Sequence, residues 1–231
     1  MKHVVYLALD FPNWNKTEEF LYENELKGVP VKVGMELFYR EGPEIIEKLK
    51  KNGHSIFLDL KLHDIPTTVE RTMENLAKLE VDIVNVHALG GNEMIKRARE
   101  GLDKGGAVRT KLIAVTILTS MNESTMNQDL HIQGKLDDQV LNLATLSKDS
   151  GADGVVCSVH EVNQIKQICG EGFLTITPGI RLKDSNVDDQ QRIATPAFAK
   201  RMGSDILVIG RSITTAEYPN AAYEKMLKEM M

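Results

Sequence analysis

The chain has 231 residues, of which 42% are hydrophobic and 26% charged, and its formal net charge is −5 at pH 7. This is the composition of a soluble globular protein, and it argues against non-specific binding to nucleic acid, which needs a clustered basic surface. No apolar run approaches the roughly 20 residues that cross a bilayer. The first apolar run is too short for a signal peptide and ends at Asp10. Two cysteines, Cys157 and Cys169, do not make a disulfide framework. We therefore expect a cytoplasmic protein with neither membrane nor nucleic acid as a partner, and Cys157 as a small core residue.

Short apolar runs with strand character alternate along the chain with longer segments of helical periodicity. The strand-like runs are residues 4–10, 29–35, 55–62, 81–88, 111–118, 154–159, 173–180 and 205–210. The clearest amphipathic stretches are 17–28, 42–53, 67–80 and 137–151. Several helical segments end in glycine, as helix C-termini often do: Gly28, Gly53, Gly151 and Gly203. This alternation predicts right-handed βαβ units and a parallel sheet.

About eight βα units in a chain of this length fit an α/β fold of the (β/α)8 TIM barrel type, with a doubly wound open sheet as the competitor. The second strand-like run favours the barrel, because Val31 and Val33 share one face while Lys32 points the other way. An open sheet covered by helices would want apolar residues on both faces. No change of composition or linker divides the chain. We predict a single TIM-barrel domain over residues 1–231.

The third strand-like run ends in the sequence DLKLHDIPTT, which places Asp59, Lys61 and Asp64 within six positions. Asp59 and Lys61 are two apart, so both side chains point to one side of the strand, into the barrel. Lys32 on the preceding strand also points inward, and Asp10 ends the first strand at the same rim. A buried ion pair often adds little net stability compared with apolar residues. We therefore interpret these charges as a catalytic centre.

Other interpretations of the same charges remain open from the residues alone. Asp64 could cap the following helix, with Thr67 and Glu70 as a capping box, and the remaining charges could form a satisfied buried ion network. Asp59 and Asp64 could also be oxygen ligands of Mg²⁺. Lys61 between them argues against that, since an ammonium repels the ion, so we predict no metal site.

The histidines give no independent sign of a metal site. The six histidines show no HxxxH or similar ligand spacing. His87 shares the inward face of its strand with Asn85. A hydrogen-bonded polar residue of the core is the simpler role for His87.

The sequences TPGIR and VIGRSIT close the seventh and eighth strands, where barrels frequently bind phosphate. Gly179 and Gly210 allow the backbone to approach an anion closely. Arg181 and Arg211 can add charge-assisted hydrogen bonds. Two polar segments follow strands on the same side and are predicted to be mobile: 119–134 and 181–194.

These motifs resemble the orotidine 5′-phosphate decarboxylase family. DLKLHDIPTTV matches the DxKxxD signature of that family, and VKVGMELF, TPGIR, DDQQRIATP and VIGRSIT fall where the family has them. The resemblance covers essentially the whole chain and is to the shorter bacterial form. It implies a homodimeric barrel that converts orotidine 5′-phosphate to UMP, the last step of de novo pyrimidine nucleotide synthesis, with no cofactor and no metal.

The resemblance also implies a role for each matching residue. Lys61 would be the proton donor to C6, and Lys32, Asp59 and Asp64 would complete the charged network, with Asp64 entering the site of the partner subunit. The implied substrate contacts are Asp10 and Lys32 at the ribose, Thr68 across the interface, Thr119 and Ser120 near the pyrimidine, and Arg181, Gln190, Gly210 and Arg211 at the phosphate. Segment 181–194 would close over the phosphate.

Two rival functions use the same scaffold. A related Mg²⁺-dependent sugar-phosphate enzyme would share DxKxxD but would need a further acidic ligand on the second strand, where Lys32 stands and Glu36 is close by. A catalytically silent nucleotide-binding protein would bind UMP without turning over the decarboxylase substrate.

Overall fold

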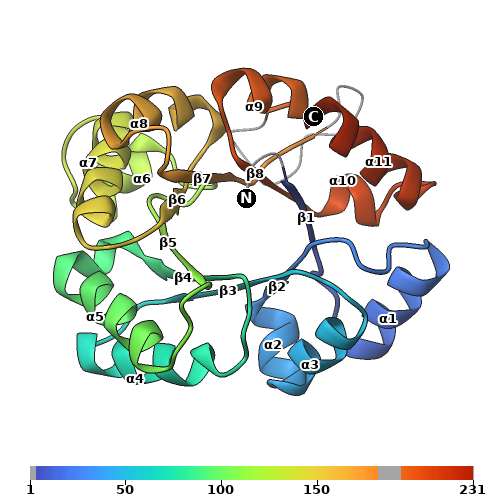
Figure 1. Cartoon of the computed structure of the whole chain (residues 1–231). Coiled ribbons are helices and arrows are strands. Elements are labelled where there is room, and N and C mark those ends of the chain that lie inside the picture. Colours follow the sequence, from blue (N-terminus) through green and yellow to red (C-terminus); the bar gives the residue numbers. More distant parts are fainter. Residues whose placement is uncertain (1–3, 182–193, 231) are drawn as a thin grey trace.

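The computed structural model describes residues 4–181 and 194–230. In this part of the chain, eight parallel strands form a closed barrel in sequence order, and β8 pairs back with β1 (Figure 1). The predicted (β/α)8 TIM barrel is therefore confirmed, and each strand lies inside one of the predicted runs. The strands are β1 Val4–Ala8, β2 Val31–Gly34, β3 Ile56–Leu62, β4 Ile83–His87, β5 Lys111–Val115, β6 Gly154–Val156, β7 Leu174–Thr177 and β8 Ile206–Ile209.

Helices surround the barrel on its outer side (Figure 1). They are α1 Trp14–Glu23, α2 Met35–Glu41, α3 Glu44–Lys51, α4 Pro66–Ala77, α5 Gly91–Lys104, α6 Glu123–Gln128, α7 Leu136–Asp149, α8 Val162–Cys169, α9 Pro196–Met202, α10 Arg211–Thr214 and α11 Pro219–Met230, with short 3₁₀ turns at Ala88–Gly90 and Val159–Glu161. Among these described helices, none is both long and apolar enough to cross a membrane.

Two helix boundaries differ from those predicted. The first helix begins at Trp14, capped by the Asn13 side chain, and ends at Glu23 rather than near Gly28. It stops early because Glu25 takes a φ of 53°, which no α-helix can continue through. The capping box of Thr67 and Glu70, considered as an alternative, does not form. The helix begins at Pro66, after the N-cap residue Ile65, and the missing N–H of proline suits a first helical position.

The core has two apolar layers. The larger layer fills the space between the strands and the helices, and Cys157 lies in it, fully buried as predicted. The smaller layer closes the inside of the barrel: Tyr6, Ala8, Phe57, Ile83, Ile113, Ile176, Ile206 and Val208. The inward positions change from Tyr6 on β1 to Asp10 just after that strand, and from Phe57 to Asp59 along β3. The barrel therefore has an apolar floor and a charged rim at the carboxyl ends of its strands.

At the opposite rim, aspartates at three equivalent positions link neighbouring strands by hydrogen bonds. One aspartate precedes each of β4, β6 and β8, and its carboxylate accepts a hydrogen bond from a backbone N–H of the preceding strand. The pairs are Asp82 with Ile56 at 2.7 Å, Asp153 with Leu112 at 2.9 Å and Asp205 with Thr175 at 2.8 Å. Polar side chains at the amino ends thus hold neighbouring strands together, the role expected of this face of a barrel.

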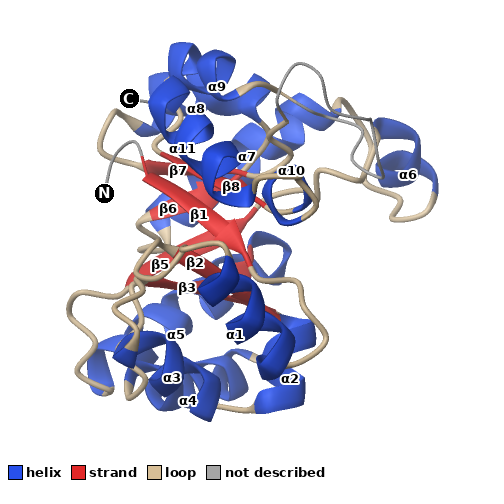
Figure 2. Ribbon diagram, turned by 90° about the vertical axis from the view of Figure 1, so that its right-hand side faces the viewer, coloured by secondary structure: helices blue, strands red, loops and turns tan. Residues whose placement is uncertain are grey.

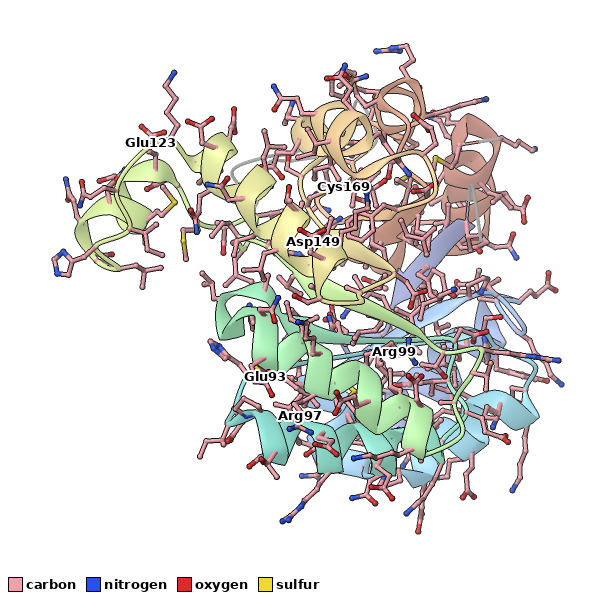
Figure 3. The ribbon with its side chains drawn as sticks, turned by 60° about the vertical axis from the view of Figure 1, so that its left-hand side comes forward. Glu93, Arg97, Arg99, Glu123, Asp149 and Cys169 are labelled. Carbon is pink, nitrogen blue, oxygen red and sulfur yellow. The ribbon has the colours of Figure 1, made fainter. Side chains whose placement is uncertain are left out.

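Helices α4 and α5 form a tight pair beside β3 and β4. Arg97 of α5 binds Glu70 of α4. It also binds Glu93, one turn earlier in its own helix, and both of these residues are labelled in Figure 3. Gly101 faces the carbonyl of Glu70 so closely that a Cβ there would collide with it. This pairing fixes α4, the helix that follows the charged end of β3.

The predicted loop at 119–134 contains α6, a short helix capped by the side chain of Asn122. Figure 2 shows α6 standing out beyond the strand ends, on the side away from the N-terminus. Glu123 ties this projection to the next helix, because its carboxylate accepts a hydrogen bond from the backbone N–H of Leu136 at 3.1 Å.

Candidate active site

The end of β3 departs from regular strand geometry at the predicted catalytic motif. The pairing of β3 with β4 shifts register between Leu58 and Leu62, and Lys61 takes a φ of 51°. Lys61 Nζ donates a hydrogen bond to Asp59 Oδ1 at 2.7 Å. A left-handed backbone at a non-glycine residue is sparsely populated and is typical of functional sites.

The neighbouring strands bring two more charges to the same place. Lys32 Nζ of β2 lies 3.1 Å from Asp10 Oδ1, just after β1, and 3.4 Å from Asp59 Oδ2. The four side chains form a chain of alternating charge, in the order Asp10, Lys32, Asp59 and Lys61. Lys32 and Asp59 are nearly buried, whereas Asp10 is open to solvent at the mouth.

The opposite charges in this network shift the pKa values of Lys32 and Asp59 so that each side chain stays ionised. Burial alone would lower the pKa of Lys32, but Asp59 and Asp10 outweigh it, so the pKa is raised. Burial alone would raise the pKa of Asp59, but Lys32 and Lys61, with hydrogen bonds from Lys61 and Asn85, hold that pKa below its usual value. Lys32 and Asp59 are therefore both charged at neutral pH.

Asn85 is the member of the network that sequence reasoning missed as a site residue. It lies on β4, its side chain is buried, and its Nδ2 donates to Asp59 Oδ1 at 2.7 Å. Its Oδ1 accepts a hydrogen bond from the backbone N–H of Lys61, also at 2.7 Å. The sequence did hold one signal for this role: Asn85 is a polar residue at an inward-facing position of its strand, as is His87.

His87 does not have the simple core role that we predicted. Its ring is only half-buried and lies 5.7 Å from the ring of His63, in the turn after β3. Burial lowers the pKa of His87, and the nearby His63 and Lys61 lower it further. A neutral imidazole at neutral pH follows from this surrounding.

A cavity opens at the carboxyl ends of the strands and joins the two predicted regions of the site. Its polar lining is Asp10, Lys32, Asp59, Lys61, Thr119, Arg181 and Arg211, together with the backbone at Gly179 and Gly210. Its apolar lining is Ala8, Phe57, Val115, Ile117, Leu118, Val156, Ile176, Pro178 and Val208. Of the residues predicted near a pyrimidine, Thr119 lines the cavity, while Ser120 is exposed outside the lining.

The two arginines stand at the β7–β8 end of this cavity. Arg181 is buried, and its Nη1 donates to the carbonyl of Ile180 at 3.1 Å and to Ser212 Oγ at 3.3 Å. Arg211 is exposed and begins α10 directly after Gly210. A Cβ at Gly210 would contact Asp10 Oδ2 at 3.6 Å, so a larger residue would narrow the cavity. Gln190 and most of segment 181–194 lie outside the described residues.

Asp64 and Thr68 do not join the cavity within one chain. Both are exposed, and they border a second hollow with Met35, Tyr39 and His63. The Asp64 carboxylate accepts a hydrogen bond from the backbone N–H of Ile65 at 2.6 Å. This hollow touches the cavity through Lys61, which lines both.

The residues considered for Mg²⁺ are not brought together. Glu36 is exposed in the first turn of α2, outside the cavity lining, and Asp64 borders the other hollow. Within residues 4–181 and 194–230, no group of three or more His, Cys, Asp or Glu side chains is placed to hold a metal ion.

Comparison with known proteins identifies the family. The model of the Orotidine 5′-phosphate decarboxylase / HUMPS family matches residues 3–226. The chain belongs to this family. It is 52% identical over 232 residues to orotidine 5′-phosphate decarboxylase of Bacillus cereus (strain Q1), covering 99% of this chain and 98% of that protein. It is 54% identical to the enzyme of the same name from Geobacillus sp. (strain WCH70), covering 96% and 95%.

A solved structure agrees with these sequence relatives. Orotidine 5′-phosphate decarboxylase from Lactobacillus acidophilus superposes with a TM-score of 0.88 at 44% identity, covering 100% of this chain and 99% of that chain. The resemblance that the motifs indicated is thus confirmed over the whole barrel.

Proposed function

We propose that this protein decarboxylates orotidine 5′-phosphate to UMP, the last step of de novo pyrimidine nucleotide synthesis. Family membership and the names of relatives at 52% and 54% identity support this reaction. The observation that carries it is the ammonium of Lys61, held 2.7 Å from Asp59 at one end of a cavity with two arginines at the other. A substrate with a carboxylate and a phosphate at opposite ends suits this distribution of charge.

The difficult step in this reaction is electrostatic. Loss of CO₂ from C6 of the pyrimidine leaves a carbanion without an adjacent electron sink. An ammonium about 4 Å from that carbanion is worth on the order of 4 kcal/mol at an effective dielectric of 20. We assign this role to Lys61, which can then deliver its proton to C6 as a general acid. No step of this scheme calls for a metal or a cofactor.

Asp59 would hold the Lys61 ammonium in place, and Lys32 would in turn hold the Asp59 carboxylate. Asp59 accepts hydrogen bonds from Lys61 and Asn85, and it faces Lys32 with its other oxygen. Asp10 at the mouth and the nearly buried Lys32 beside it would hold the ribose hydroxyls. The apolar lining beyond them would exclude water and strengthen each of these interactions.

Arg181 and Arg211 would bind the phosphate with charge-assisted hydrogen bonds, beside the backbone of Gly179 and Gly210. Gln190 keeps the role that the family resemblance implies, as does closure by segment 181–194. Binding energy from this remote group would orient the pyrimidine ring over Lys61. Thr119, in the cavity wall, would lie near the ring, while Ser120 could reach it only by a change in the loop.

We further propose a homodimer in which Asp64 and Thr68 enter the partner's site. Both residues are exposed beside a hollow that reaches Lys61. Large apolar residues on the same face are exposed to solvent: the exposed fraction is 71% for Tyr39 and 69% for Ile65. Covering that face would bury these side chains and place a second carboxylate near the Lys61 ammonium. A cytoplasmic location remains part of the proposal.

The decisive test is an assay of the purified protein with orotidine 5′-phosphate in excess EDTA. Loss of the orotate-ring absorbance, with UMP identified by chromatography, is the expected result. No turnover in EDTA or in Mg²⁺, with UMP still bound, would favour a silent nucleotide-binding protein. No turnover and no UMP binding would favour a sugar-phosphate enzyme, which would be active with its own substrate only when Mg²⁺ is supplied.

A further inference from the structure

We propose that Asn85 is a positioning residue that holds Lys61 in its left-handed backbone conformation and orients the Asp59 carboxylate toward both lysines. This inference rests on the proposed catalytic role of Lys61. Asn85 lies on β4, one strand away from both residues that it would position. It is 1% exposed, so its side chain has no access to bulk water.

The first contact compensates for the irregular strand. Because the register of β3 against β4 shifts between Leu58 and Leu62, the backbone at Lys61 is out of the regular ladder. Its N–H donates instead to the side-chain Oδ1 of Asn85 at 2.7 Å. The amide oxygen thus replaces the backbone carbonyl that would accept this hydrogen bond in a regular sheet. The contact is made with Lys61 in its left-handed backbone conformation.

The second contact sets the direction of the carboxylate. Asn85 Nδ2 donates to Asp59 Oδ1 at 2.7 Å, and the same oxygen accepts the hydrogen bond from Lys61 Nζ. The other oxygen, Oδ2, is thereby left toward Lys32, 3.4 Å away. Turning the plane of the carboxylate would break the bond to Asn85, so the amide fixes the plane in which one oxygen faces Lys61 and the other faces Lys32.

The chemistry of the two partners leaves only one orientation for the amide. A backbone N–H can only donate and a charged carboxylate can only accept, so Oδ1 must face Lys61 and Nδ2 must face Asp59. A neutral group with a donor and an acceptor is needed at this position. An aspartate would keep the acceptor but would turn an oxygen toward Asp59, and a leucine would keep the volume but lose both bonds.

Three variants test the proposal: Asn85→Leu, Asn85→Asp and, as a control, Thr110→Val. Thr110→Val also removes a buried hydrogen bond, which Thr110 Oγ1 donates to the carbonyl of Val81. This bond lies at the opposite rim of the barrel, away from the cavity. A displacement of about 1 Å at a reacting group can lower a rate about 100-fold. We therefore expect kcat of Asn85→Leu to fall by about this factor, with KM and UMP affinity nearly unchanged and with Thr110→Val active.

Asn85→Asp separates positioning from packing through its pH profile. At neutral pH the new carboxylate repels Asp59, and kcat is low. As the pH falls, a protonated carboxyl at this position regains a donor for Asp59, so kcat relative to the wild type rises. Retained kcat in folded Asn85→Leu would overturn the proposal. So would a loss in Asn85→Asp that does not change with pH, and this arm remains decisive if Asn85→Leu does not fold.

Since these variants are compared with a wild type that turns over substrate, failure of the proposed reaction itself would be seen first, in the wild-type assay.

Discussion

The ammonium of Lys32 and the carboxylate of Asp59 lie 3.4 Å apart on adjacent strands, with only 11% and 10% of the two side chains exposed. Removing Asp59 leaves the nearly buried Lys32 ammonium with only the exposed Asp10 carboxylate as a partner, and it takes the acceptor away from Asn85 Nδ2. We expect Asp59→Ala to lower the free energy of unfolding by about 3–5 kcal/mol, measured by urea denaturation. Asp10→Ala removes a carboxylate that is 61% exposed and should cost at most about 1 kcal/mol. Equal losses in the two variants would contradict this account of the network.

Lys61→Ala should fold but lose nearly all turnover. Its side chain is partly exposed, and Asp59 keeps Lys32 and Asn85 as partners when it is removed. An ammonium worth on the order of 4 kcal/mol corresponds to a loss of about 1,000-fold or more in kcat. UMP affinity, measured by calorimetry, should change little by comparison. A variant that retains turnover would remove Lys61 from the role of proton donor.

Arg211→Ala should weaken phosphate binding. Loss of a hydrogen bond to a charged group costs about 1.5–3 kcal/mol, so the Kd for UMP should rise by roughly 10- to 100-fold. The matched control is Arg109→Ala, another exposed arginine, which lies by the hollow at the amino-end rim of the barrel. Calorimetric titration with UMP distinguishes them. An unchanged Kd in Arg211→Ala would mean that the phosphate binds elsewhere.

The fold could be predicted from sequence because its signals are local. Apolar runs of strand length, separated by amphipathic segments, predicted all eight strands and their closure. Helix ends were less predictable, since the positive φ of Glu25 has no strong signal in its residue type. The start of α4 did have a signal, because Pro66 occupies the first helical position that proline favours, and the alternative capping box at Thr67 does not form.

The site was predictable as a set of charges but not as a geometry. The alternation of side chains along a strand predicted that Lys32, Asp59 and Lys61 all point into the barrel and lie close together. The shift of register that bends β3 depends on how it pairs with β4, so neither the conformation of Lys61 nor the double contact of Asn85 can be read from either strand alone. Asp64 was placed in the same cluster because it follows directly after the strand, and the family resemblance added that it enters the partner's site. Within one chain it borders the second hollow instead.

Asp64 should act across a subunit interface. Lys61→Ala and Asp64→Asn should each be inactive alone, whereas a heterodimer of the two contains one site with both native residues. After random exchange, half of the dimers are mixed, so activity should recover to about a quarter of the wild type. Subunit exchange is verified by mass spectrometry of the native dimers. Absence of recovery after verified exchange would rule out a shared site.

His54 should make the barrel less stable in mild acid. Its ring is buried, Nδ1 lies 2.7 Å from the carbonyl of Val29, and Nε2 is buried without a hydrogen-bond partner in the described structure. Burial lowers the pKa of His54, outweighing the bond to Val29, and the positive charge of Lys27 lowers it further. Protonation therefore favours the unfolded chain, where the pKa is about 6.5.

The stabilising effect of neutral His54 is complete above about pH 6.5 and is lost as the pH falls from there toward the lower pKa of the folded state. His54→Asn should keep a donor for the Val29 carbonyl but remove the titration, so its free energy of unfolding should decline less between about pH 6.5 and pH 5. The control is His131→Asn, at an exposed residue with a φ of 55°, which asparagine accepts readily. It should keep the wild-type slope in urea denaturation at each pH. An identical slope in His54→Asn would show that another group governs the acid sensitivity of the barrel.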